Sequence, residues 1–120
     1  MPLANPSPEG FWFGSDSLWL RLNGDGRWNG LYRTDLLAYR NKIMFFRKGF
    51  SSSQEAPLVV IAKRLDAAAP QARSERASGS FNEQTGPMIM TAIDLPDVGC
   101  WSLSAQFEQE PPLVFVVSVP

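Results

Sequence analysis

The chain has 120 residues, 44% of them hydrophobic, and a formal net charge of −1 at pH 7. This length fits one domain, and the apolar content is enough for a packed core without metals or disulfide bonds. The cationic side chains are scattered, which argues against the continuous basic surface that nucleic acid requires. We therefore expect a single folded domain that does not bind nucleic acid.

The first residues are rich in proline and predict an extended N-terminal lead-in over residues 1–13, followed by one domain over residues 14–120. They lack the basic and apolar regions of a signal peptide. No run of ~18 apolar residues predicts a transmembrane segment in this chain.

Short strand-like segments follow, separated by turns. Alternating leucines predict a strand over residues 18–22, and the Asn-Gly-Asp-Gly sequence at 23–26 predicts a tight turn into a short strand within 27–32. Residues 35–39 fit either one helical turn capped by Asp35 or a loop. Further strands are predicted over residues 42–47, 58–65 and 88–95, in a segment that opens at Gly99, and over 113–119.

Residues 66–87 are polar and show no sustained period, so they predict a long connection that is either mobile or functional. About seven strands and no amphipathic helix predict an all-β antiparallel β-sandwich. A small β-barrel is the alternative. A βαβ fold is disfavoured, because no helix of the required length separates the strands.

The C-terminal tail is expected to form a closing β-hairpin whose residues fill the core. Trp101 is in phase with Leu103 and Phe107, so these side chains should share the buried face. A small apolar residue suits the start of this strand, which predicts that Cys100 is a buried structural cysteine. The predicted core residues are Cys100, Trp101, Leu103, Phe107 and Phe115.

The candidate binding residues are three tryptophans, namely Trp12, Trp19 and Trp28. If the leucines of segment 18–22 face inward, Trp19 faces outward, where a large aromatic often marks an interface. Such residues could stack on a sugar or pack against a partner protein. The alternative is that the N-terminal segment folds over Trp19.

Catalytic and metal-binding patterns are weak. The chain has no histidine and one cysteine, so Ser-His and Cys-His nucleophile pairs are excluded and the commonest metal ligand is missing. The Asn-Gly-Asp-Gly turn lacks the later carboxylates of a calcium loop. Arg64 and Asp66 are expected to brace the following loop, and neither a cofactor nor a metal site is predicted.

Four segments together resemble a group of uncharacterised bacterial exported domains, often lipoprotein-like. They are residues 45–49 (FFRKG), 62–66 (AKRLD), 95–101 (LPDVGCW) and 113–119 (LVFVVSV). The resemblance spans roughly residues 14–119, and the chain departs from it by carrying Lys63 where an arginine is usual. It implies an immunoglobulin-like β-sandwich located outside the cytoplasm, in the cell envelope or secreted.

The function expected from these observations is a non-catalytic interaction or structural domain with an unknown protein or glycan as partner. A carbohydrate-binding module that uses exposed tryptophans is an alternative. A small carboxylate-based hydrolase is disfavoured, because nothing in the sequence pairs the dispersed Asp and Glu residues. An unpaired edge strand would also allow a homodimer.

Overall fold

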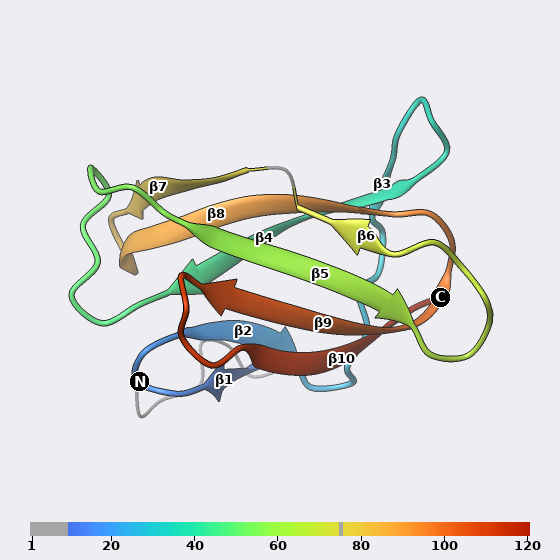
Figure 1. The fold of residues 1–120 in the computed structure, drawn as a ribbon, viewed down its shortest axis with the longest axis horizontal. Helices are drawn as coiled ribbons and strands as arrows, with labels where there is room; N and C mark the ends of the chain where they lie inside the picture. Colours follow the sequence, from blue (N-terminus) through green and yellow to red (C-terminus); the bar gives the residue numbers. More distant parts are fainter. Residues whose placement is uncertain (1–9, 75) are drawn as a thin grey trace.

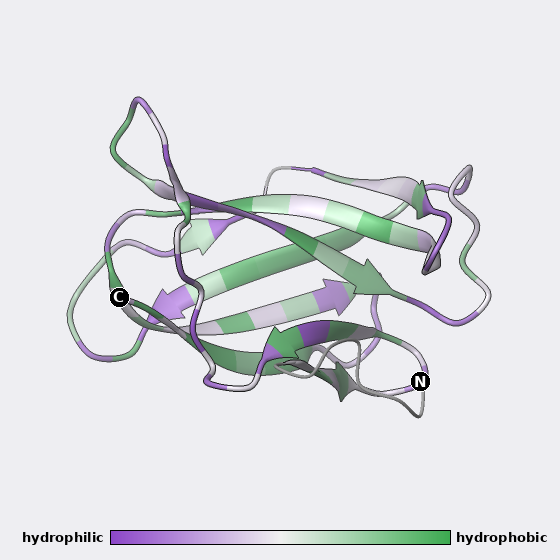
Figure 2. Ribbon diagram, turned by 180° about the vertical axis from the view of Figure 1, so that it is seen from behind, coloured by the Kyte–Doolittle hydropathy of each residue, from purple (hydrophilic) through white to green (hydrophobic). Residues whose placement is uncertain are grey.

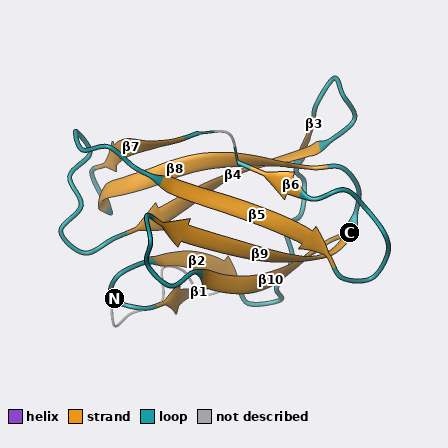
Figure 3. Ribbon diagram, viewed as in Figure 1, coloured by secondary structure: helices purple, strands orange, loops and turns teal. Residues whose placement is uncertain are grey.

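The computed structural model describes residues 10–74 and 76–120, and among these residues it contains ten β-strands and no helix (Figures 1 and 3). The strands are β1 (Gly10–Gly14), β2 (Trp19–Asn23), β3 (Tyr32–Arg33), β4 (Tyr39–Phe46), β5 (Leu58–Arg64), β6 (Ala72–Arg73), β7 (Ala77–Asn82), β8 (Gly86–Leu95), β9 (Gly99–Phe107) and β10 (Leu113–Val119).

The strands form two antiparallel sheets that face each other. The six-stranded sheet has the order β1-β2-β4-β8-β7, with β3 paired to β4, and the four-stranded sheet has the order β10-β9-β5-β6. In Figure 1 the four-stranded sheet lies in front of the six-stranded sheet. The predicted β-sandwich is confirmed, and within the described residues the sheets are not closed into the alternative β-barrel.

The core lies between the sheets because side chains alternate along each strand. Leu20 of β2, Phe45 of β4 and Val60 of β5 point inward and are fully or almost fully buried. Figure 2 shows the resulting alternation of hydrophobic and hydrophilic residues along several strands. Each strand therefore gives one face to the core and one to the outside.

The predicted N-terminal boundary is wrong. β1 (Gly10–Gly14) pairs along its whole length with β2, so residues 10–13 belong to the six-stranded sheet and not to a lead-in. The proline-rich sequence before them suggested a domain that begins at residue 14, four residues after the start of β1. Residues 1–9 lie outside the described residues.

The segment after the first turn also differs from its prediction. Residues 27–32 do not form one strand. The segment contacts β10 through an isolated bridge between Arg27 and Ser118. Within it, only Tyr32 belongs to a strand, the short β3 (Tyr32–Arg33), which pairs with β4. Residues 35–39 are not helical. Residues 35–38 belong to a turn in which Thr34 N–H donates to the Ala38 carbonyl at 2.8 Å, and Tyr39 begins β4. The β3–β4 hairpin projects from the sandwich (Figure 1).

Residues 66–87 are not one structureless connection. They contain β6 and β7, and β7 pairs with β8 at the edge of the six-stranded sheet. Gly79 of β7 lies against the chain at Ser52, where a Cβ would approach the Ser52 carbonyl oxygen to 2.2 Å. A residue without a side chain is therefore required at position 79. The small and polar residues of β7 lack the apolar alternation by which a strand is recognised.

Candidate functional site

A groove of about 630 Å³ opens on the outer face of the six-stranded sheet, and we call it the outer groove. Its walls come from β1, β2, β4 and the turn between β7 and β8, with the loop after β2 at one end. The residues that line it are Trp12, Leu20, Arg21, Asn23, Trp28, Asn29, Leu31, Asn41, Lys42, Ile43, Met44, Phe46, Asn82, Gln84, Thr85 and Met88.

The outer groove exists because β2 and β4 pair over a short length only. Their register covers Trp19 with Phe46 and Leu20 with Phe45. Beyond β2 the chain crosses to the other sheet, where Ser118 N–H donates to the Gly26 carbonyl at 2.8 Å. The two strands therefore separate, and the space between them reaches down to core residues.

One side of the outer groove is aromatic and apolar. The Trp12 ring meets the Phe46 ring edge-on at a centroid distance of 5.4 Å, and the Trp19 ring stacks on Phe46 at 6.2 Å. Met88 is almost fully buried, whereas Met44 keeps 46% of its surface exposed. The partly exposed Trp12 and Met44 therefore offer apolar surface to a ligand.

The rim of the outer groove is polar, and the described residues place no carboxylate on it. It contains the amide side chains of Asn23, Asn29, Asn41, Asn82 and Gln84, together with Thr85 and the cations Arg21 and Lys42. Each amide group can both donate and accept hydrogen bonds. The rim is therefore suited to a ligand that carries several hydroxyl groups.

Two rim side chains are held in place by hydrogen bonds. Arg21 Nη1 donates to Asn23 Oδ1 at 3.1 Å, and Asn23 Nδ2 donates to the Arg27 carbonyl at 2.7 Å. The Arg21 guanidinium also lies against Gly10, where a Cβ would come within 2.7 Å of Nε. Because Gly10 has no side chain, Arg21 can lie across β1.

The three predicted tryptophans occupy different environments. Trp12 is half-buried and lines the outer groove. Trp19 lies on the outer face, as the alternation predicts, but it does not line the groove, and its buried Nε1 has no hydrogen-bond acceptor within the described part of the chain. Trp28 is not the exposed platform that was predicted, because it is only 8% exposed and packs against Phe115.

The predicted brace is an ion pair. Arg64 Nε donates to Asp66 Oδ1 at 2.9 Å, and its Nη1 donates to Asp97 at 3.2 Å. The hydrogen bonds from Arg64 and from the Cys100 N–H lower the pKa of Asp66 below its usual value. The brace thus joins the end of β5 to the turn that precedes β9.

The predicted core residues of the tail are buried with one exception. Trp101, Leu103, Phe107 and Phe115 belong to the main core cluster, and Trp101 Nε1 donates to the Asp97 carbonyl at 3.2 Å. Cys100 is only half-buried. Because neighbouring strand residues face opposite ways, the inward Trp101 turns Cys100 outward, so Cys100 is not a core residue.

A second ion pair links the two sheets away from the outer groove. Arg47, the residue after β4, donates to both carboxylate oxygens of Glu110, with Nη1 at 2.7 Å from Oε1. Its guanidinium lies 4.0 Å from the centre of the Phe107 ring. This arrangement fixes the loop between β9 and β10 on the six-stranded sheet.

Within the described residues, no group of three or more His, Cys, Asp or Glu side chains could hold a metal ion. The same residues include no helix long and apolar enough to cross a membrane. Comparisons of the chain with family models, with curated proteins and with solved structures find no significant match.

Sequence reasoning identified Trp12 but missed the outer groove as a whole. The amide side chains come from segments far apart in the chain, such as Asn23 at the end of β2, Asn41 in β4 and Asn82 in β7. The pairing of β2 with β4, of β4 with β8 and of β8 with β7 brings them to one groove. The clustering of asparagines near strand ends was the one available signal.

Proposed function

We propose that the protein is a non-catalytic binding domain and that the outer groove binds carbohydrate. The observation that supports this most directly is the position of the half-buried Trp12 beside a rim of five side-chain amides. Sugars present C–H faces that pack on aromatic rings and hydroxyl groups that need donors and acceptors together. The volume of about 630 Å³ is that of a typical small-ligand site.

A catalytic role receives no support from the same surface. Within the described part of the chain, the residues that line the outer groove include no Asp, Glu, Cys or Tyr, so none of these side chains would act as the general acid or base of a glycosidase. Stacking and hydrogen bonding remain as the available interactions.

The test is a titration of soluble oligosaccharides followed by tryptophan fluorescence and calorimetry. Trp12→Ala should weaken binding by at least tenfold, an effect of about 1.4 kcal/mol. Val116→Ala is the matched control, because Val116 is exposed on the four-stranded sheet. Saturable binding that Trp12→Ala leaves unchanged would place the site elsewhere.

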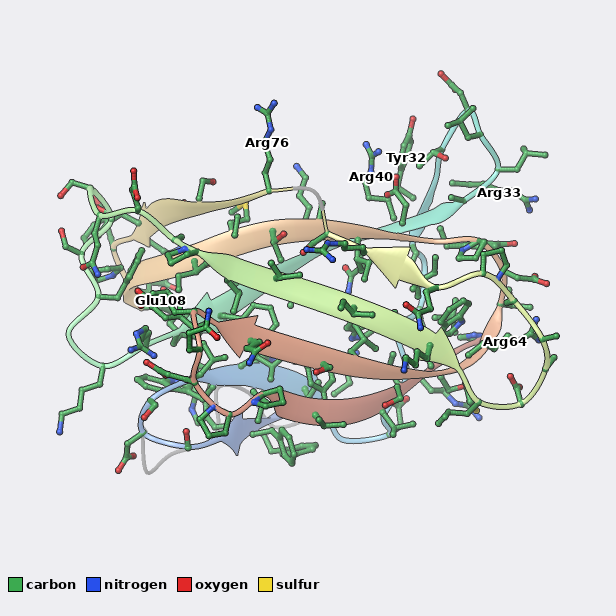
Figure 4. The ribbon with its side chains drawn as sticks, viewed as in Figure 1. Tyr32, Arg33, Arg40, Arg64, Arg76 and Glu108 are labelled. Atoms are coloured by element: carbon green, nitrogen blue, oxygen red, sulfur yellow. The ribbon has the colours of Figure 1, made fainter. Side chains whose placement is uncertain are left out.

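A second candidate is a protein-binding function of the β3–β4 hairpin. Leu36 and Leu37 at its tip are 91% and 62% exposed, and Leu37 has a φ of 62°, which favours Gly or Asn. Figure 4 shows Tyr32, Arg33 and Arg40 around the base of this hairpin. An apolar residue kept in an unfavourable and exposed position supports contact with a partner protein.

The tip can be tested by comparing stability with binding. Leu37→Asn should raise the free energy of unfolding by about 1 kcal/mol, since Asn tolerates this backbone conformation. If the tip contacts a partner in envelope extracts, Leu36→Ser with Leu37→Asn should abolish capture of that partner. Capture that survives the double variant would reject this function.

We also propose an immunoglobulin-like sandwich in the bacterial cell envelope or extracellular space. The order β2-β4-β8-β7 opposite β10-β9-β5 corresponds to the A-B-E-D and G-F-C sheets of that class. The resemblance of four sequence segments to exported bacterial domains supports the location. Fractionation of the producing cells with an antibody to the protein tests it, and recovery in the cytoplasm alone would reject it.

A further inference from the structure

We infer that the ligand of the outer groove is an acidic glycan, whose carboxylate or sulfate group lies beside Lys42. This inference rests on the proposed carbohydrate-binding function and assigns the class of sugar. Its basis is the separation of charge on the six-stranded sheet, together with the residues that line the groove.

The outer groove is cationic although the chain as a whole is not. Arg21 and Lys42 line it and, among residues 10–74 and 76–120, no carboxylate does, whereas the whole chain has a formal net charge of −1. Glu83 belongs to the turn that supplies Gln84 and Thr85, but it does not line the groove. An anionic ligand would therefore meet the positive charge of Lys42 on entering.

Lys42 is the cation best placed to meet that ligand. On the same face of β4, Arg40 is neutralised by Asp94 through two hydrogen bonds of 2.7 and 2.9 Å. Lys42 is exposed, and within the described part of the chain it makes no ion pair or hydrogen bond. The charge of Lys42 is thus available to a ligand, whereas the charge of Arg40 is balanced by Asp94.

The surroundings of Lys42 explain why the anion should be part of a sugar. Met44 follows it on the same face of β4, and Trp12 and the amides complete the groove. A small inorganic anion would leave the aromatic wall and the amide rim unused. A sugar ring with one acidic substituent would engage all three kinds of surface.

The experiment compares one sugar backbone with and without its charge. Oligogalacturonate and its methyl ester have the same rings, and only the free acid carries carboxylates. At about 0.02 M salt the free acid should bind at least tenfold more tightly than the ester, and the difference should shrink at about 0.5 M salt, because ions screen the attraction. A sulfated oligosaccharide titrated in parallel distinguishes sulfate from carboxylate as the acidic group.

Lys42→Met is the decisive variant, because it removes the charge and keeps an apolar stem. It should reduce the preference for the free acid to less than about threefold. Lys63→Met is the matched control, since Lys63 is exposed on the four-stranded sheet, and it should keep the preference. The melting temperature of each variant shows that it is folded.

The outcomes separate the two proposals. Equal binding of acid and ester, or a preference that survives Lys42→Met, overturns the inference and leaves the carbohydrate-binding proposal standing. Failure of every acidic and neutral oligosaccharide to bind overturns both.

Discussion

The ring of Trp12 meets the ring of Phe46 at 88°, with the centroids 5.4 Å apart. The contact spans the width of β2, because Trp12 belongs to β1 and Phe46 to β4. It joins the edge of the six-stranded sheet to its centre and sets the aromatic wall of the outer groove. Edge-to-face pairs of this kind contribute energy beyond the area that they bury.

A double-mutant cycle on Trp12→Ala and Phe46→Leu should therefore show a coupling energy of about 0.5–1.5 kcal/mol in the free energy of unfolding. Urea denaturation of the four proteins measures it. The same cycle on Trp12→Ala and Val116→Ala should be additive, because Val116 lies on the other sheet. Additivity of the first pair would show that the edge-on contact does not stabilise the fold.

Trp101→Ala should destabilise the protein by about 3–5 kcal/mol, since Trp101 is fully buried and the substitution leaves a large cavity. Trp101→Phe keeps most of the packing and loses the Nε1 hydrogen bond to the Asp97 carbonyl, so it should cost less. Urea denaturation compares the two variants. A Trp101→Ala protein with the stability of the wild type would remove Trp101 from the core.

Gly99→Ala should cost about 1–3 kcal/mol. Gly99 has a φ of 129°, and a Cβ there would lie 2.6 Å from Arg64 Nε and 2.8 Å from Asp66 Oδ1. The variant would therefore disturb the brace as well as strain the backbone. Gly30→Ala is the control, because Gly30 has a φ of 65° but open space around it. Thermal unfolding should show the larger loss for Gly99→Ala, and equal losses would mean that the brace is unaffected.

Stability should fall as the pH drops below about 4. The hydrogen bonds from Arg47 lower the pKa of Glu110, and those from Arg40 lower the pKa of Asp94. A carboxyl whose pKa is lower in the folded state stabilises the protein above its unfolded pKa of about 4, and this contribution is lost as the pH falls through the folded value.

The measurement is the urea midpoint from pH 7 to pH 2.5, a range that covers both states of the carboxyls. Glu110→Gln with Asp94→Asn should flatten the acid part of the profile while lowering stability near neutral pH. Asp35→Asn is the control, because Asp35 is exposed and lies in the turn of the projecting hairpin. An unchanged acid profile in the double variant would assign the acid sensitivity to other groups.

The parts of the fold that sequence could predict are those with strong alternation. Leucines at 18, 20 and 22 and the run from Trp101 to Phe107 each place apolar residues at every second position. Both segments contain a strand, β2 and β9, whose apolar face is buried. The same alternation should have excluded Cys100 from the core. Cysteine is often buried in proteins, but the position of Cys100 next to the inward-facing Trp101 determines that it faces outward.

The parts that sequence could not predict depend on contacts between distant segments. β7 is an edge strand of small and polar residues, and its strand conformation follows from pairing with β8. Trp28 lies in the core because its segment crosses to β10, where Trp28 N–H donates to the Ser118 carbonyl at 2.9 Å. Neither relationship leaves a local pattern in the sequence.

The outer groove depends on the pairing of β4 with β8, in which Tyr39 lies opposite Leu95. It therefore needs both halves of the chain. Its two central strands come from opposite halves of the chain, so neither half synthesised alone contains both walls. Closing a loop of this length before the contacts form is slow, which predicts late appearance of the groove during refolding. A peptide cut from this protein would keep the asparagines and tryptophans but lose the surface that they make together.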